Sequence, residues 1–223
     1  MPKSKGVPPA DPAPIEKPQA AVNISEPAIR QYCDYMEAVK QRMAAIASMG
    51  SQPIRELLPG EIQVESIYLQ FRKILELIAM GSLFNNKAEY AKARADFDKD
   101  WNARRILNNL AKVNPEFYPK PVIDEVIDEM PVLRPASGAL TRSDFEQLYD
   151  RCGEILHTAN PFGNRIDYKK LSGEITGWLG KIVALLNQHQ VHLLGEDGFW
   201  LIQMTTTTSD RVHYSRFEPE IRK

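Results

Sequence analysis

Three charged residues, Glu65, Arg72 and Glu76, are spaced seven and four residues apart in the most apolar stretch of the chain. At helical spacing their side chains stack on one face. A carboxylate pair beside an arginine can perform acid/base chemistry when the site is desolvated and the pKa of one carboxyl group is raised. The simpler interpretation is an ion pair between Arg72 and Glu76, which contributes only about 0.2–0.5 kcal/mol when exposed.

A second candidate pair, Arg151 and His157, lies in a segment with a helical pattern that leads into a polar loop containing Asn160. Projected at about 100° per residue, the apolar residues of this helix gather on one side. Arg151 lies to the edge of that side and His157 lies opposite it. A site on a groove or dimer surface and a plain solvated face both fit this placement.

An arginine and a histidine separated by five residues, near the end of a helix in an α-helical bundle, resemble the motif of the HEPN family. That resemblance implies a metal-independent ribonuclease, of the kind found in bacterial toxin–antitoxin and phage-defence systems, in which two protomers bring their motifs together. It further implies that Arg151 stabilises phosphate charge, that His157 is the acid/base group acting on the RNA 2′-hydroxyl, and that Asn160 is a supporting polar group. The runs 71–78, 114–119 and 152–163 also resemble an uncharacterised bacterial protein family, a likeness that implies no activity.

Composition argues against several other functions. The chain has 28 Lys and Arg against 29 Asp and Glu, so its total charge gives no sign of the basic face that strong DNA binding requires. Cys33 and Cys152 have apolar neighbours, which predicts two buried thiols, and no set of residues has metal-ligand spacing. Glycine-rich phosphate loops, nucleophile elbows and dinucleotide fingerprints are absent, so no cofactor is expected. Without a secretory signal or a membrane-length apolar run, the expected location is cytoplasmic.

Apolar periodicity predicts helices for most of the chain. In 25–46 one face carries Ile29, Tyr32, Cys33, Met36, Val39, Met43 and Ile46. In 61–84 a broader stripe carries Val64, Ile67, Tyr68, Phe71, Ile74, Leu75 and Ile78, so this helix is expected at the centre of the bundle. Residues 122–130 are ambiguous, with a short helix slightly favoured over a strand, and residues 131–138 are expected to be loop. Ser143 and Glu146 are expected to form a capping box. The remaining predicted helices cover 25–46, 61–84, 87–97, 101–113, 143–158 and 168–188.

The period changes from helical to alternating near the C-terminus, where three antiparallel strands are predicted at 191–194, 199–206 and 212–217. The predicted fold is therefore mainly α, an irregular bundle of five to seven helices with a small C-terminal three-stranded antiparallel β meander. The expected organisation is a disordered Pro-rich tail (1–22), a helical bundle (23–189) and a β appendage packed on the bundle (190–223).

Without a strong catalytic motif, the favoured function is a non-catalytic helical interaction module, acting through a protein partner or as a homodimer. The alternative is the HEPN-like ribonuclease, with RNA as its substrate and Arg151, His157 and Asn160 as its site residues.

Overall fold

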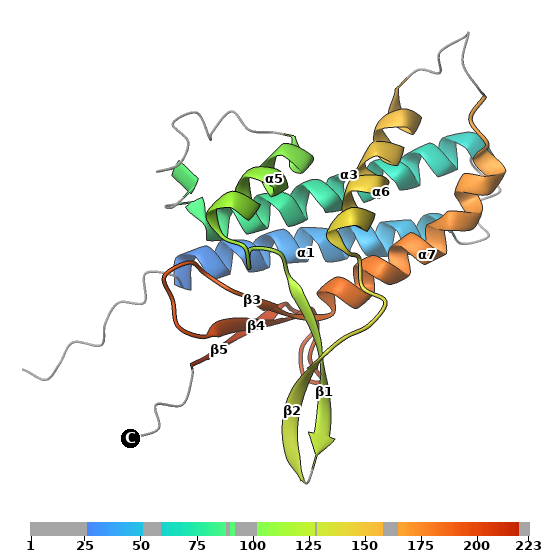
Figure 1. Cartoon of the computed structure of the whole chain (residues 1–223). Coiled ribbons are helices and arrows are strands. Elements are labelled where there is room, and N and C mark those ends of the chain that lie inside the picture. Colours follow the sequence, from blue (N-terminus) through green and yellow to red (C-terminus); the bar gives the residue numbers. More distant parts are fainter. Residues whose placement is uncertain are drawn as a thin grey trace, which may run out of the picture.

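The computed structural model describes residues 26–50, 59–87, 90–91, 102–127, 129–157 and 165–218. The predicted tail (1–22), most of the predicted 87–97 helix and Asn160 lie outside the described residues. The helices are α1 (Glu26–Met49), α3 (Gly60–Asn85), α5 (Ala103–Val113), α6 (Arg142–Leu156) and α7 (Tyr168–Leu186). The strands are β1 (Lys120–Ile127), β2 (Met130–Pro135), β3 (Gln188–Val191), β4 (Phe199–Gln203) and β5 (His213–Phe217) (Figure 1).

Helix α3 is the centre of the helical layer, since it contacts α1, α5, α6 and α7. Phe71, Ile74 and Ile78 are fully buried on it, which confirms the prediction that its broad apolar stripe faces a shared interior. Burying a side chain of this size contributes roughly 1.5–3 kcal/mol relative to leaving it in water. The helix is therefore held by packing on several sides.

The start of α6 differs from the sequence prediction by two residues. Thr141 is the N-cap: its hydroxyl accepts from the backbone N–H of Asp144, and the Asp144 carboxylate accepts from the backbone N–H of Thr141. The predicted capping box of Ser143 and Glu146 was therefore wrong. An aspartate can serve at the third helical position because its carboxylate reaches back as a glutamate does. The Lys181 ammonium also donates to Asp144, at 2.6 Å, and ties α6 to α7.

The predicted fold class was wrong in its sheet. The described strands form one five-stranded antiparallel sheet in the order β2-β1-β3-β4-β5, not a three-stranded meander. Residues predicted as a short helix (122–130) and a loop (131–138) instead supply β1 and β2, which pair from Val122 opposite Pro135 to Ile127 opposite Met130. The first strand of the predicted meander also lies earlier, at Gln188–Val191, because α7 ends at Leu186.

The misassigned segment contains a tandem repeat, Val-Ile-Asp-Glu over 122–125 and again over 126–129. Its apolar residues recur four apart, which mimics one face of a helix. Flanking prolines at 119, 121, 131 and 135 limit helix growth at both ends, and β-branched side chains favour extended backbone. Glu129, with φ of 66°, takes the left-handed conformation that a tight hairpin turn needs.

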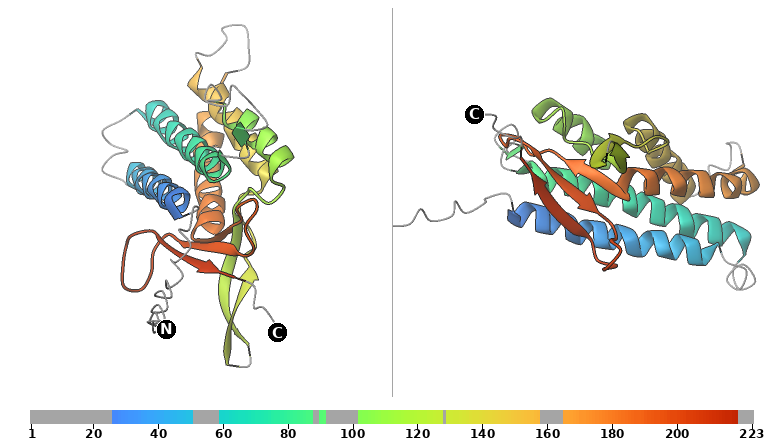
Figure 2. Two further views of the ribbon diagram at one scale, coloured as in Figure 1. Left: turned by 90° about the vertical axis from the view of Figure 1, so that its left-hand side faces the viewer. Right: turned by 90° about the horizontal axis from the view of Figure 1, so that it is seen from below.

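The molecule is two layers, a helical layer and the sheet, with one part of the sheet left uncovered. The inner face of β3 and β4 is buried and includes His189, Val191, Trp200 and Ile202. Side chains of α1 reach the same part of the sheet, as when the Lys40 ammonium donates to the Met204 carbonyl at 3.1 Å. The β1–β2 hairpin instead projects away from the helices (Figures 1 and 2). We call residues 122–135 the arm.

Candidate functional site

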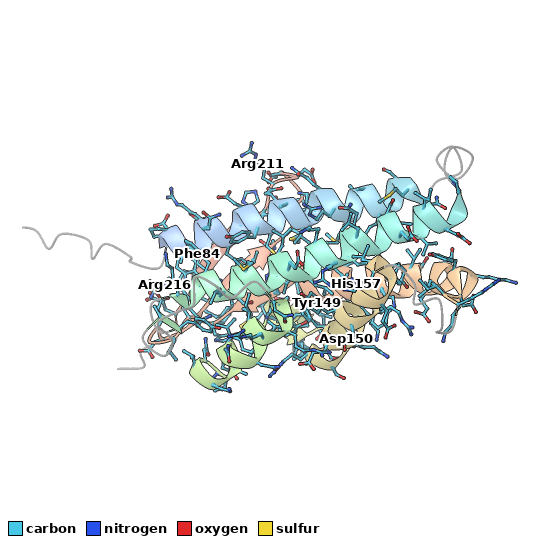
Figure 3. The ribbon with its side chains drawn as sticks, turned by 90° about the horizontal axis from the view of Figure 1, so that it is seen from above. Phe84, Tyr149, Asp150, His157, Arg211 and Arg216 are labelled. Atoms are coloured by element: carbon cyan, nitrogen blue, oxygen red, sulfur yellow. The ribbon has the colours of Figure 1, made fainter. Side chains whose placement is uncertain are left out.

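Arg151 and His157 both belong to the surface of α6, but no described contact joins them. The Arg151 guanidinium is half-buried and lies 3.5 Å from the Glu154 carboxylate, one turn along the same helix. His157 is exposed and ends α6, where its backbone N–H donates to the Gly153 carbonyl. Figure 3 places His157 at the end of this helix, with Arg211 well apart from it beyond α1. The HEPN-like assignment of this pair stays a prediction.

The three charged residues of α3 are divided between two separate contacts. Arg72 donates from Nε to Glu76 at 3.1 Å and from Nη2 to the Tyr149 hydroxyl at 3.0 Å, and its guanidinium lies over the Tyr149 ring. Glu65 instead accepts from the Tyr168 hydroxyl at 2.6 Å. This hydrogen bond is the main cause that raises the pKa of Tyr168 to about 12. The two carboxylates therefore have different partners, each of which joins α3 to another helix.

Buried polar side chains elsewhere have structural roles. His189, fully buried on β3, has Nδ1 at 2.9 Å from the Leu186 carbonyl and Nε2 at 2.8 Å from the Tyr32 hydroxyl. A carbonyl only accepts, so Nδ1 carries the proton and Nε2 accepts from Tyr32. Burial lowers the pKa of His189 to about 4, so the ring is neutral at physiological pH and joins the sheet to α1.

The two cysteines lie inside the molecule, as predicted. Burial raises the pKa of the Cys33 and Cys152 thiols to about 12. A thiol in that state is a poor nucleophile and a poor metal ligand. Within the described ranges, no group of three His, Cys, Asp or Glu side chains is arranged to hold a metal ion.

The arm is the part of the described chain where apolar side chains meet solvent on both faces. Residues opposite one another in the register point to the same side, so Ile123, Ile127, Met130 and Val132 share one face. Val126 lies on the other face with Pro131 and Leu133. Val126 and Met130 are 72% and 65% exposed. Beyond Val122, which is buried at the base of the arm, neither face has an underlying layer, and a two-stranded hairpin alone is only marginally stable in water.

The two edges of the arm differ in what they can bind. The Ala136 N–H donates to the Pro121 carbonyl at 3.0 Å. In an antiparallel pair every second residue faces the partner strand, so Pro121, Ile123, Glu125 and Ile127 direct their backbone polar groups toward β2. Asp124 and Val126 then direct their backbone groups outward, and β3 pairs only with Lys120 and Pro121. Two of the three outward positions on β2 are prolines, which cannot donate. The open edge for strand pairing is therefore β1.

The charge of the arm and a cavity at its base also affect what can bind at the β1 edge. Residues 122–135 contain four acidic residues and one basic residue, Arg134, which forms an ion pair with Glu125 across the two strands. A cavity of about 530 Å³ lies at the base of the arm, and its lining includes Tyr118, Val122, Leu133 and Pro135. The arm thus combines exposed apolar side chains, an acidic edge and an adjoining recess.

Sequence reasoning missed the arm because residues 122–130 were ambiguous and a short helix was slightly favoured there. The flanking prolines are the signal that could have indicated a hairpin. No family model, curated protein or solved structure matches this chain. Among the described helices, none has both the length and the apolar composition needed to span a lipid bilayer.

Proposed function

We propose that this protein is a non-catalytic interaction module that binds an extended, basic segment of a partner protein along the open edge of β1. The observation that carries the proposal is the arm, whose β1 edge presents unpaired backbone groups at Asp124 and Val126. Adding a strand to an exposed edge supplies main-chain hydrogen bonds, and alternate side chains then set specificity.

The charge of the arm favours a basic partner over a second copy of this chain. Pairing β1 with β1 of another copy would bring Asp124 and Glu125 of both copies together, and like charges opposite one another destabilise a strand pair. Lysine or arginine side chains on an incoming strand would instead face these carboxylates. Such contacts steer the encounter and weaken as salt rises.

The test uses a fluorescent octapeptide of alternating lysine and valine, titrated with the full chain while fluorescence anisotropy is measured. We expect saturable binding that weakens with salt, and no binding of a matched peptide in which glutamate replaces lysine. Val126→Pro removes an outward N–H without touching the ladder to β2, so it should weaken binding at least about tenfold. Val126→Thr keeps that N–H and is the matched control, expected to bind as the parent does.

Two results would count against the proposal. Equal binding by the Val126→Pro and Val126→Thr variants would show that the β1 edge is not used. A concentration-dependent dimer that Val126→Pro dissociates, measured by sedimentation, would assign the edge to self-association instead.

A further inference from the structure

A second cavity, separate from the arm, lies among three helices. It has a volume of about 400 Å³, within the range of roughly 300–1,000 Å³ typical of small-molecule sites. Leu77 and Met80 of α3 and Ala103 and Ile106 of α5 supply apolar lining, and Arg42 of α1 lines it as well. All these residues belong to well-formed helices, so the cavity is a fixed part of the helical layer.

Arg42 is the unusual member of this lining, because none of the described carboxylates lies within ion-pair distance of it. Its Nη1 donates to the Gln70 side-chain oxygen at 2.7 Å. Its Nε is buried without a hydrogen-bond partner in the described part of the chain, and no described bond uses Nη2. An atom as buried as Nε is closed to a ligand, so Nη2 is the charged donor of this guanidinium that remains for an oxygen of an anion.

The other charges at this cavity are already matched. Glu76 accepts from Arg72 on one oxygen, at 3.1 Å, and from Lys73 on the other, at 3.0 Å. One carboxylate therefore lies between two cations, and Arg42 adds a third positive charge with no counter-ion in the described residues. A half-buried guanidinium with Nη2 free gains when an anion accepts a hydrogen bond from that nitrogen.

We propose that this cavity binds a small organic carboxylate with an apolar body. The carboxylate accepts from Nη2 of Arg42, and the hydrocarbon part lies against Leu77, Met80 and Ile106. This site is independent of the arm, so it stands or falls apart from strand binding there.

Octanoate is a suitable probe, followed by NMR on protein with isotope-labelled methionine methyl groups. We expect the Met80 methyl resonance, assigned with Met80→Leu, to shift saturably as octanoate is added below its micelle concentration. Met130 lies on the arm, so its methyl resonance is expected not to shift. Octylammonium has the same chain with the opposite charge, and should bind at least about tenfold more weakly than octanoate.

Variants of Arg42 locate the anion contact. Arg42→Gln should lower octanoate affinity by about tenfold, and Arg42→Lys should restore part of it, since the lysine ammonium keeps the positive charge but not the position of Nη2. Arg30→Gln is the matched control on the same helix, because Arg30 is exposed and pairs with Glu26. Circular dichroism would establish that each variant is folded.

Three results would overturn the proposal. One is equal binding of octanoate and octylammonium to the parent protein, which needs no variant. Another is an octanoate affinity of a folded Arg42→Gln variant that equals that of Arg30→Gln. The third is an octanoate titration that shifts Met130 rather than Met80.

Discussion

Two parts of the sheet, the pair β3–β4 and the pair β1–β2, lie in opposite surroundings. In the first part, the inner residues of β3 and β4 are covered by the helical layer, so His189 and Ile202 are fully buried. In the second part, β1 and β2 leave the helices, and Val126 is 72% exposed. Residues with the same preference for strands therefore stabilise the fold in one part and are free to contact other molecules in the other.

The largest expected difference between these two parts is in core packing. Ile202→Ala should lower the free energy of unfolding by about 2–5 kcal/mol, because it leaves a cavity in a dry, packed interior. Val126→Ala on the arm should change that free energy by less than about 0.5 kcal/mol, as surface substitutions usually do. Urea unfolding followed by circular dichroism measures both. Similar values for the two variants would mean that the arm is covered in solution.

Sequence reasoning worked best where a helix buries one continuous side. The stripe predicted for the first helix includes Ile29, Tyr32, Met36 and Val39, and all four are buried on α1. In the same way the apolar residues predicted to be inside α3 are buried. Period and burial agree in these segments because a single face of each helix meets the core.

Prediction failed in the arm because most of its residues do not face a core. Val122 and Val126 lie on one face of the hairpin, and Ile123 and Ile127 on the other, so the strand period of two divides the apolar residues between both sides. The same residues recur with a period near that of a helix, so the apolar pattern alone does not separate the two interpretations. The hairpin depends on flanking prolines and on the turn at Glu129, where φ is positive in a residue type that rarely adopts it.

The candidate sites show the same dependence on tertiary structure. Spacing alone placed Glu65 near Arg72, but in the structure the Glu65 carboxylate accepts a hydrogen bond from the Tyr168 hydroxyl of α7. Neither the free edge of β1 nor the missing counter-ion of Arg42 has a local signature. Both depend on where other elements of the fold lie, so residues nearby in the sequence could not have predicted them.

The second-largest expected effect is on the pH dependence of stability, and it comes from His189 in the covered part of the sheet. In the folded state the pKa of His189 is about 4, against an ordinary value near 6.5. Between these values the unfolded chain binds a proton that the folded chain does not, so stability is full above about pH 6.5 and falls as the pH is lowered toward 4. The loss reaches about 3 kcal/mol at most. Urea unfolding at a series of pH values measures it.

A His189→Gln variant tests whether that proton belongs to His189. It should be less stable than the parent at pH 7, because its amide cannot reproduce both hydrogen bonds of the ring, yet its stability should fall less steeply between pH 6.5 and 4. Parallel pH profiles for the variant and the parent would assign the acid sensitivity to other groups.

The smallest expected effect is at the tip of the arm, and it separates local from global stability. In the covered part of the sheet the left-handed turn position is already a glycine, Gly198 with φ of 95°, whereas the arm has Glu129 at φ of 66°. A side chain in this conformation costs about 1 kcal/mol, so Glu129→Gly should stabilise the hairpin by about 0.5–1 kcal/mol. Amide hydrogen exchange at Glu125 and Val132 should then slow by about two- to fivefold, with exchange in β4 unchanged. If exchange slowed equally in β4, the arm would unfold together with the rest of the sheet and not as a separate unit.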